Sequence, residues 1–457
     1  MANRRELSRR DFMRLSALAA AGAMAAACAP AAPQAPAPEA APPAEEKPAE
    51  QPAAPAGGGT KVQLYTLVWQ EGAVAATQKA VEDWNAANKA RIEIEYIQGS
   101  WGNARDYLTT SIAGGVVPEV IHGITMWANE YGTQGSYLDL SEMIANSDLA
   151  TDLHPAALAA ATSPLDDKIY GLPWCWEVGM MYVNADRITA AGFEVPSKGW
   201  SWEDFITIAK AVSKPPDYYG FAANLSATQT TEDIIAWMWQ TGAEVMGEID
   251  GVWKIDMEPA REALQLWYDM LWTYEIISPD SFGGTNIFEA FPLGVYSMMQ
   301  TGNWARGLIK SAEPEFTWHI VPLPCHKRCA NSSEPQTWSL ATQSRERGTT
   351  EAAWEVLQWM SNKENSAAIA FGDWLFPTRQ SAMADPRFTT STDDWDVTLS
   401  QVEFGKAYPK HPAWAEFDER VLGPNIQKYL QKELSLDELL NLCNEEGTKL
   451  LGQYKVG

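Results

Sequence analysis

Residues 168–184, KIYGLPWCWEVGMMYVN, decide how the chain is organised. Residues 170–174 are apolar and aromatic, but their Gly and Pro exclude a helix and interrupt a strand ladder. Residues 180–184 then have the continuous apolar character of a buried strand. We interpret the segment as a crossover between two lobes. Its indoles and its one carboxylate, Glu177, suggest a ligand site.

The composition is that of a large, acidic, globular chain. Its 457 residues fit a leader followed by two lobes of roughly 200 residues each. Hydrophobic residues make up 46% of the chain, which is enough for sizeable cores. The formal net charge of −25 argues against nucleic acid or another polyanion as a partner, because phosphate contacts need clustered Lys and Arg.

The first 28 residues have the pattern of an export signal. Residues 8–14, SRRDFMR, match a twin-arginine signal, and residues 15–27 form a short apolar stretch. Residues 25–28, AAAC, match a lipobox, so we expect the mature chain to begin at a lipid-modified Cys28. The alternative, a transmembrane anchor, is disfavoured because this apolar stretch is too short to span a bilayer.

Residues 29–59 are rich in Ala and Pro and contain no aromatic residue. Such a chain cannot form a core and stays extended. We expect it to be a tether.

The next residues predict a β-α-β-α-β order. Strands are expected at residues 61–68 and 91–97 and from residue 118, with helices between them. This order is typical of a mostly parallel sheet covered by helices, in which ligands bind beyond the carboxyl ends of the strands. Residues that directly follow strand ends are therefore candidates for a site: Trp69, Glu71, Trp127 and Glu130.

Several segments resemble a known family when they are taken in order. They are YGLPW (170–174), YVN (182–184), AGFEVPSKGWSWEDF (191–205), FEAFPLGVYSMMQTGNWARGLI (288–309) and GDWLFPTR (372–379). This series is similar to that of the family 1 extracellular solute-binding proteins, the maltose-binding-protein-like lipoproteins of ABC sugar importers. The resemblance extends over most of the chain from about residue 60 onward.

The resemblance implies an α/β fold of the two-lobed, periplasmic-binding-protein-like type II. Each lobe would be a mostly parallel sheet flanked by helices, with the ligand cleft between the lobes. Lobe 1 would comprise residues 60–173 and 301–370, and lobe 2 residues 174–300 and 371–457.

The resemblance also implies a function. The chain would be an extracytoplasmic, lipid-anchored binding protein, exported by the twin-arginine route, that captures a carbohydrate by hinge closure. It would deliver this ligand, an oligosaccharide on our interpretation of the many Trp, to the membrane subunits of an ABC importer. We expect a monomer that is not an enzyme and has no cofactor and no metal. The sequence does not reveal which sugar is bound.

Sugar rings need flat aromatic surfaces for their C–H faces and polar groups for their hydroxyls. The chain has 21 Trp, and many follow predicted strand ends or breaks. For any one Trp, ordinary packing in a core is as consistent as stacking on a ligand. The candidates for ligand binding are Trp69, Glu71, Trp101, Trp127, Glu130, Trp174, Trp176, Glu177, Asn303, Trp304, Trp338, Asp373, Trp374 and Arg379.

Cysteine spacing favours one disulfide. Cys325 and Cys329 enclose a short loop, and in an oxidising compartment a bridge is the simplest interpretation. A metal site is the alternative, but only His326 lies nearby and structural zinc needs four ligands. Cys175 and Cys443 are expected to be free and buried.

Two other classes of protein remain open. The chain has no phosphate-binding loop, no HExxH motif and no GxSxG motif. A pair of carboxylates such as Glu71 and Glu177 could still serve a secreted glycoside hydrolase. A lipid-tethered adhesion or structural protein is the other alternative, and it would bind no small ligand.

Overall fold

The structure is a computed structural model that describes residues 59–454, except 227–229, 284–285 and 391–394. The predicted export signal with Cys28, and the predicted tether apart from Gly59, lie outside these residues. The described residues belong to one compact unit. Among them, no helix is both long enough and apolar enough to cross a membrane.

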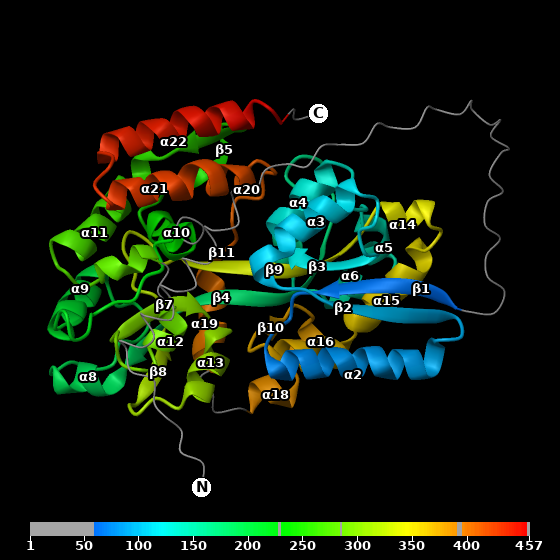
Figure 1. The fold of residues 1–457 in the computed structure, drawn as a ribbon, viewed down its shortest axis with the longest axis horizontal. Coiled ribbons are helices and arrows are strands. Elements are labelled where there is room, and N and C mark those ends of the chain that lie inside the picture. The colour runs from blue at the N-terminus through cyan, green and yellow to red at the C-terminus, as the bar shows by residue number, and fades with distance from the viewer. Residues whose placement is uncertain (1–58, 227–229, 284–285, 391–394, 455–457) are drawn as a thin grey trace, which may run out of the picture. The chain divides into compact units, whose positions relative to one another are not determined.

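In the described chain, nine strands form one mixed sheet (Figure 1). Its order is β10-β4-β9-β3-β1-β2, with β11 beside β9, and β7 and β8 beside β4. The strands are β1 (Thr60–Thr66), β2 (Ile92–Gln98), β3 (Val120–Ile124), β4 (Leu172–Asn184), β7 (Met298–Gly302), β8 (Trp318–Val321), β9 (Asn331–Leu340), β10 (Phe376–Pro377) and β11 (Gly405–Lys406). A separate hairpin joins β5 (Val245–Ile249) to β6 (Val252–Asp256).

The helices connect and cover these strands. The first group is α2 (Glu71–Asn88), α3 (Ala104–Ala113), α4 (Thr125–Thr133), α5 (Ser141–Ala145), α6 (Leu149–Asp152), α7 (Pro155–Ala161), α8 (Ala185–Ala190), α9 (Trp202–Ala211), α10 (Thr230–Gln240) and α11 (Arg261–Trp272). The second group is α12 (Ile287–Ala290), α13 (Ala305–Ala312), α14 (Gln343–Glu346), α15 (Thr350–Met360), α16 (Lys363–Gly372), α17 (Gln380–Met383), α18 (Pro386–Thr389), α19 (Trp395–Gln401), α20 (Trp414–Phe417), α21 (Gly423–Leu430) and α22 (Leu436–Leu451).

The first strands follow the predicted β-α-β-α-β order. Strand β1 pairs in parallel with both β2 and β3. Its alternating side chains enter different hydrophobic clusters: Leu64 packs in the cluster that includes residues of α2, and Tyr65 in the one that includes residues of α3. Helices therefore cover both faces of this part of the sheet. Strand β9 pairs antiparallel with β3 and β4, and β4 pairs antiparallel with β7, β8 and β10, whereas β11 pairs in parallel with β9. The sheet as a whole is therefore mixed.

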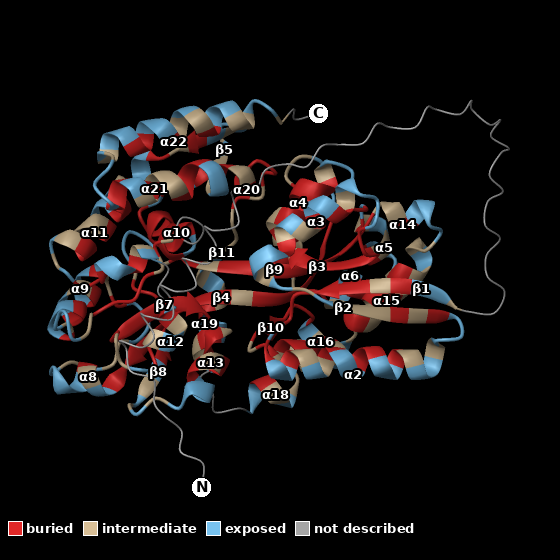
Figure 2. Cartoon of the chain, in the orientation of Figure 1, coloured by how far each residue is buried: buried red, intermediate tan, exposed pale blue. Residues whose placement is uncertain are grey.

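Strand β4 connects two large hydrophobic clusters. Met180 and Tyr182 point into the first cluster, and Met181 and Val183 into the second, because successive side chains of a strand point to opposite faces. Figure 2 shows β4 and β9 as largely buried strands. The predicted interruption at Pro173 is a shift of register between Pro173 and Cys175 within one continuous 13-residue strand.

Other local predictions can be compared with the structure directly. Ser201 and Asp204 form the expected capping box at the start of α9. Residues 218–223, which the sequence predicts as a strand, make only isolated bridges. The sequence also predicts a polar loop directly before Trp338, but the residues there belong to the buried strand β9. Pairing with β4 supplies backbone partners there, so polar side chains do not prevent a strand.

The cysteine predictions agree with the structure. Cys325 and Cys329 form a disulfide. Cys175 and Cys443 are free and buried. The disulfide closes the loop between β8 and β9. This loop lies next to Trp200 and Trp202, whose backbones form hydrogen bonds with that of Cys325.

Helices α2 and α16 pack together through two glycines. A Cβ atom at Gly372 would lie 2.5 Å from the backbone nitrogen of Ala73 and 2.5 Å from the carbonyl carbon of Gly72. Backbone atoms cannot move aside as a flexible side chain can, so only glycine allows this close approach.

We predict that Gly372→Ala lowers the free energy of unfolding by about 1–3 kcal/mol, because it forces apart two packed helices. Urea denaturation followed by circular dichroism measures this change. Gly102→Ala is the control, because the nearest atom to its new Cβ is 4.0 Å away. Equal stability of the Gly372→Ala variant and the parent chain would contradict the proposed packing.

Candidate ligand-binding site

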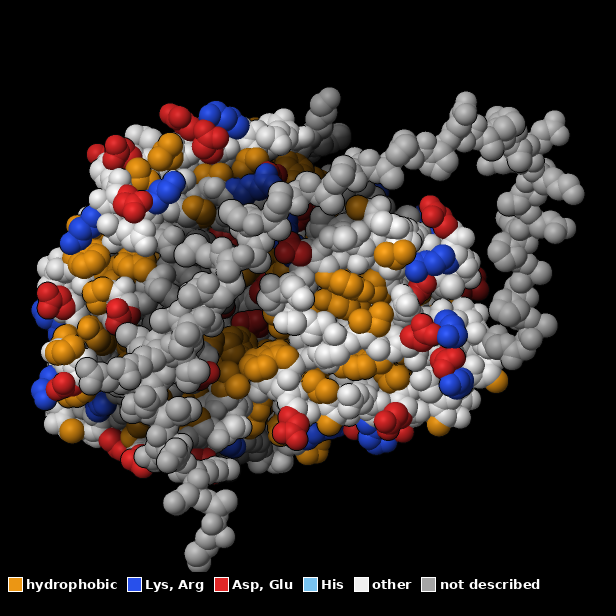
Figure 3. All heavy atoms as spheres, viewed as in Figure 1, with side chains coloured by type: hydrophobic (Ala, Val, Ile, Leu, Met, Phe, Trp, Pro, Cys, Tyr) orange, Lys and Arg blue, Asp and Glu red, His pale blue; other side chains and the backbone are white. Residues whose placement is uncertain are grey.

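A cavity of about 1040 Å³ lies within the compact unit. Its lining comes from segments that are far apart in the sequence. In Figure 3, acidic and apolar side chains are seen together in the hollow near the middle of the face shown. The lining residues are Trp69, Gly99, Ser100, Trp101, Ile124, Met126, Glu177, Gly179, Asn224, Glu232, Asp233, Asn286, Ile287, Phe288, Glu289, Pro292, Leu293, Gln300, Thr301, Gly302, Trp304, Leu308, Ala312, Ser332, Glu334, Gln336, Asp373, Leu375 and Tyr408.

Strand alternation places polar side chains in this cavity. Ser332, Glu334 and Gln336 are two residues apart along β9, so they lie on one face of the strand, and all three line the cavity. Glu177 of β4 is the register partner of Glu334, and it lines the cavity too. The paired strands therefore form a polar floor whose backbone groups are already hydrogen-bonded.

Three indoles supply aromatic surface. Trp69 follows β1 and is 41% exposed, and its ring centroid lies 5.7 Å from that of Trp304. The Trp304 Nε1–H donates to Glu177 Oε1 at 2.7 Å, which fixes the orientation of that ring. Trp101 also lines the cavity, and its ring contacts those of His122 and Trp127. Gly302 leaves room for the contact between Trp304 and Glu177, since a Cβ there would lie within 2.5 Å of both side chains.

A buried histidine orients one amide of the floor. The Leu67 N–H donates to His122 Nδ1 at 2.9 Å, so the ring proton is on Nε2 and is donated to Gln336 Oε1 at 2.8 Å. Burial lowers the pKa of His122 to about 3, so the ring is neutral. Because the Gln336 oxygen accepts this bond, its amide nitrogen is the donor that acts on Glu177.

Five carboxyl groups of the cavity have raised pKa values: those of Glu177, Glu232, Asp233, Glu334 and Asp373. Desolvation is the main cause for each, and the charge of Glu177 adds to it for Glu232, Glu334 and Asp373. Glu232 is exposed inside the cavity, yet the surrounding protein raises its pKa to about 8. The pKa is about 7 for Asp233, Glu334 and Asp373, and it is also raised for Glu177.

The structure separates the predicted site residues into two groups. Trp69, Trp101, Glu177, Trp304 and Asp373 line the cavity. Their assignment to ligand binding remains a prediction. The other nine do not line it, and their surroundings explain why.

Four of these nine are indoles of the interior. Trp174 stacks on Trp338 with ring centroids 5.5 Å apart, and both contact His122. Trp176 is buried beside His154. Trp127 is buried behind Trp101, 5.9 Å between ring centroids. Trp occurs in this chain both at strand ends and at core positions. The sequence alone therefore could not show which Trp line the cavity and which pack in the interior.

Trp374 and Asn303 have structural contacts near the cavity. Trp374 stacks on Trp395, with ring centroids 6.0 Å apart. Asn303 is fully buried; its side chain accepts from the Val178 N–H at 2.9 Å and donates to the Trp374 carbonyl at 2.8 Å. These bonds hold the end of β7 against β4 and against the segment that carries Asp373.

Three charged residues also belong to the nine predicted site residues that do not line the cavity. Glu71 is exposed in the first turn of α2. Glu130 forms an ion pair with Arg105 at 2.9 Å. Arg379 is buried; it pairs with Asp148 and Asp152, and donates to the Ser361 carbonyl at 2.9 Å. This guanidinium therefore anchors the segment after β10 to α6.

Sequence reasoning did not identify several lining residues. Glu334 and Gln336 lie in the segment before Trp338 that the sequence predicts as a polar loop. Glu232 and Asp233 were interpreted only as the start of a helix. Tyr408 lies outside every regular element of its region. The one signal available was the proximity of Glu334 and Gln336 to Trp338 in the sequence.

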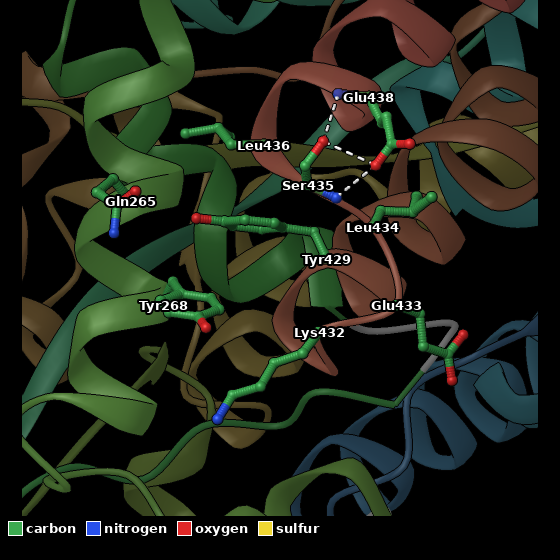
Figure 4. Close-up of a pocket in the computed structure, with 9 residues that line it drawn as sticks. All are labelled: Gln265, Tyr268, Tyr429, Lys432, Glu433, Leu434, Ser435, Leu436 and Glu438. Carbon is green, nitrogen blue, oxygen red and sulfur yellow. Dashed lines mark hydrogen bonds between the residues drawn. The ribbon is translucent and has the colours of Figure 1, made fainter.

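A second hollow of about 500 Å³ lies beside α11, α21 and α22 (Figure 4). Figure 4 shows the rings of Tyr268 and Tyr429 in it, with centroids 5.3 Å apart. Ser435 and Glu438 form the capping box of α22 and are already hydrogen-bonded to each other. None of the predicted site residues lies there, so we take the larger cavity as the candidate site.

The fold is that of a maltose-binding-protein-like, type II periplasmic binding protein. The structure matches maltose-bound MalE3 of T. maritima with a TM-score of 0.75 at 18% identity, covering 86% of this chain and 100% of that one. It matches the GacH receptor of Streptomyces glaucescens, solved unliganded and with acarbose, with a TM-score of 0.74 at 20% identity, covering 87% and 100% of the two chains.

Residues 79–397 match the family described as bacterial extracellular solute-binding protein, and the chain belongs to this family. It is also 27% identical over 402 residues to an uncharacterized lipoprotein in the oleD 5′ region of Streptomyces antibioticus, covering 83% of this chain and 84% of that protein. The family and these structural neighbours are binding proteins.

We predict that the ligand-free protein becomes less stable as the pH rises from about 6.8 to 8. A carboxyl group with a raised pKa holds its proton in the folded state and loses it in the unfolded state, so stability falls with pH in this range. The buried His122 and His411 oppose this only at lower pH, where unfolded histidine becomes protonated.

Melting temperatures across this range at constant ionic strength provide the measurement. Glu232→Gln should make the decline shallower, because it removes the group whose pKa is about 8. Glu445→Gln, on the exposed face of α22, should leave the slope unchanged. An unchanged slope in Glu232→Gln would contradict the raised pKa.

We also predict that Arg379→Met lowers the free energy of unfolding by about 3 kcal/mol, because it leaves the partly buried Asp152 without its cation and the Ser361 carbonyl without its donor. Ligand affinity should not change, since Arg379 does not line the cavity. Arg91→Met removes an exposed ion pair with Glu355 and should cost less than about 1 kcal/mol. Urea denaturation and calorimetric titration measure the two effects; a loss of affinity with unchanged stability would return Arg379 to the ligand site.

Proposed function

We propose that the chain is an extracytoplasmic, lipid-anchored binding protein that captures a carbohydrate in the larger cavity and delivers it to the membrane subunits of an ABC importer. The cavity itself carries this proposal: Trp69, Trp101 and Trp304 offer ring faces beside a polar floor. Apolar C–H faces and hydroxyl groups of a sugar need this combination. The reported likeness to maltose-bound and acarbose-bound proteins supports the same ligand class.

Capture would proceed by hinge closure between two lobes. Lobe 1 would comprise residues 60–173 and 301–370, and lobe 2 residues 174–300 and 371–457. Trp69 and Gln336 line the cavity from the first set, and Asp233 and Gln300 from the second. A ligand that contacts both sets favours the closed form by its greater affinity for that form. A cavity volume of about 1040 Å³, which is large for a single ring, supports an oligosaccharide as the ligand.

Attachment to the membrane would occur through Cys28, after export by the twin-arginine route. The lipobox supports this step, and so does the relative that is described as a lipoprotein. The closed protein would act as a monomer on its importer and would release the sugar unchanged. A glycoside hydrolase would instead release a product, and an adhesion protein would bind no small ligand.

A thermal-shift screen against mono- and oligosaccharides tests this proposal. A bound sugar at a hundred times its dissociation constant stabilises the folded state by about 2.7 kcal/mol. Equilibrium dialysis followed by chromatography should recover the sugar unchanged. A hydrolysed sugar would favour the enzyme, and no stabilisation by any sugar would overturn the proposal.

We predict that Trp69→Ala weakens binding of the best sugar by about tenfold, which is the loss of about 1.4 kcal/mol of stacking. Trp69 is the indole most exposed in the cavity. Trp354→Ala is the matched control, because Trp354 is half-buried on α15 and does not line the cavity. Isothermal titration calorimetry measures both; equal affinity of the Trp69→Ala variant and the parent would remove Trp69 from the site.

A further inference from the structure

The charges that line the larger cavity are all of one sign. Six carboxylate side chains contribute to the lining: Glu177, Glu232, Asp233, Glu289, Glu334 and Asp373. Among the described residues of this lining, none is Lys, Arg or His. A site that binds only neutral hydroxyl groups does not need so many carboxylates as hydrogen-bond acceptors, because amide and hydroxyl groups can accept these bonds as well.

Neutral donors hold several of these carboxylates in place. Glu177 accepts from the Trp304 indole at 2.7 Å, and Asp233 from the Asn224 N–H at 2.7 Å. Glu334 accepts from the Thr125 hydroxyl and from the Tyr408 N–H at 3.2 Å. These bonds orient the carboxyl groups, and no cation of the described chain pairs with any of the three. Glu177 therefore raises the pKa of neighbouring carboxylates through its charge.

Two carboxylates are left with unused acceptor capacity. Asp373 is only 2% exposed and lines the cavity, and its Oδ1 has no hydrogen-bond partner in the described structure. Glu232 is exposed inside the cavity, and no cation of the described chain pairs with it. A buried carboxylate oxygen without a donor is costly, so its place in a cavity points to a donor that arrives with the ligand.

We propose that the ligand of this cavity is a sugar that carries a protonated amine, and that Asp373 and Glu232 receive this amine. This inference rests on the proposed function, because it specifies the chemistry of the sugar that the cavity takes. An ammonium group donates charge-assisted hydrogen bonds to carboxylates, while the sugar rings contact Trp69 and Trp304. The same indoles also attract a cation to their faces.

A metal ion does not explain the carboxylates equally well. Within the part of the chain that the structure describes, no three His, Cys, Asp or Glu groups are arranged so that they could hold a metal ion. The carboxylates are instead distributed around a cavity of about 1040 Å³. This spread fits an organic ligand that extends across the cavity.

The test compares matched pairs of ligands by isothermal titration calorimetry at about pH 7.5 and low salt. Each pair is a 2-amino- or 6-amino-deoxy mono- or disaccharide and the parent sugar with a hydroxyl group at the same position. We expect at least one amino sugar to bind at least about tenfold more tightly than its parent. Added salt should weaken its binding more than that of the parent.

Variants test whether the tighter binding of the amino sugar depends on the carboxylates of the cavity. Glu232→Gln keeps the size of the side chain and should remove most of the advantage of the amino sugar, while circular dichroism confirms the fold. Asp373→Asn is the second variant and should act in the same direction. Glu445→Gln, on the exposed face of α22, removes one carboxylate elsewhere and should leave the advantage intact.

The outcomes separate this proposal from the proposed function. If parent sugars bind as tightly as amino sugars throughout, or if both variants keep the full advantage, the amine proposal is overturned and sugar binding stands. If no sugar of either kind binds, both proposals fail.

Discussion

The structure depends on the pairing of two long strands, β4 and β9, within one sheet. Their backbones are hydrogen-bonded to each other and to strands on either side. The side chains therefore determine whether a face of these strands packs in a hydrophobic cluster or lines the cavity. In β4 the alternating residues Met180 and Met181 enter separate hydrophobic clusters. Glu177 and Glu334, paired across the two strands, line the cavity. A shift of one residue in either strand would exchange core and cavity side chains.

This constraint explains what the sequence could predict. The apolar run at 180–184 is short and is bounded by Gly179 and Asn184, which favours a buried strand, so its strand was predictable. The spacing of Ser201 and Asp204 likewise predicts the capping box. Strand β9 was not predictable, because hydrophobic periodicity is the main signal of a strand and Glu334 and Gln336 remove it. Trp69 and Trp174 both follow features that break regular structure. Only the packing of His122 and Trp338 around Trp174 distinguishes the core indole from the one in the cavity.

The cavity combines a fixed geometry with carboxyl groups that have no cation among the described residues of its lining. The Trp304 indole and the backbone N–H groups hold carboxylates by neutral hydrogen bonds, which constrain direction without cancelling charge. The buried Arg379 instead supplies a cation for Asp152, whereas no Lys, Arg or His lines the cavity among the described residues. Unpaired acidic groups reduce stability, and such costs are typical of binding sites.

The segment from Gly372 to Arg379 shows how closely framework and site are connected. Gly372 allows two helices to touch, Asp373 lines the cavity, and Arg379 anchors the end of the segment through ion pairs. Gln70 donates to the Asp373 carbonyl at 2.9 Å and to the Trp304 carbonyl at 3.0 Å, so one amide joins both cavity walls to the start of α2. Because Asp373 is held on both sides by residues that do not line the cavity, its carboxylate has little freedom to move. A charge fixed in this way can discriminate where a donor lies on a ligand, because a displaced donor finds no carboxylate that follows it.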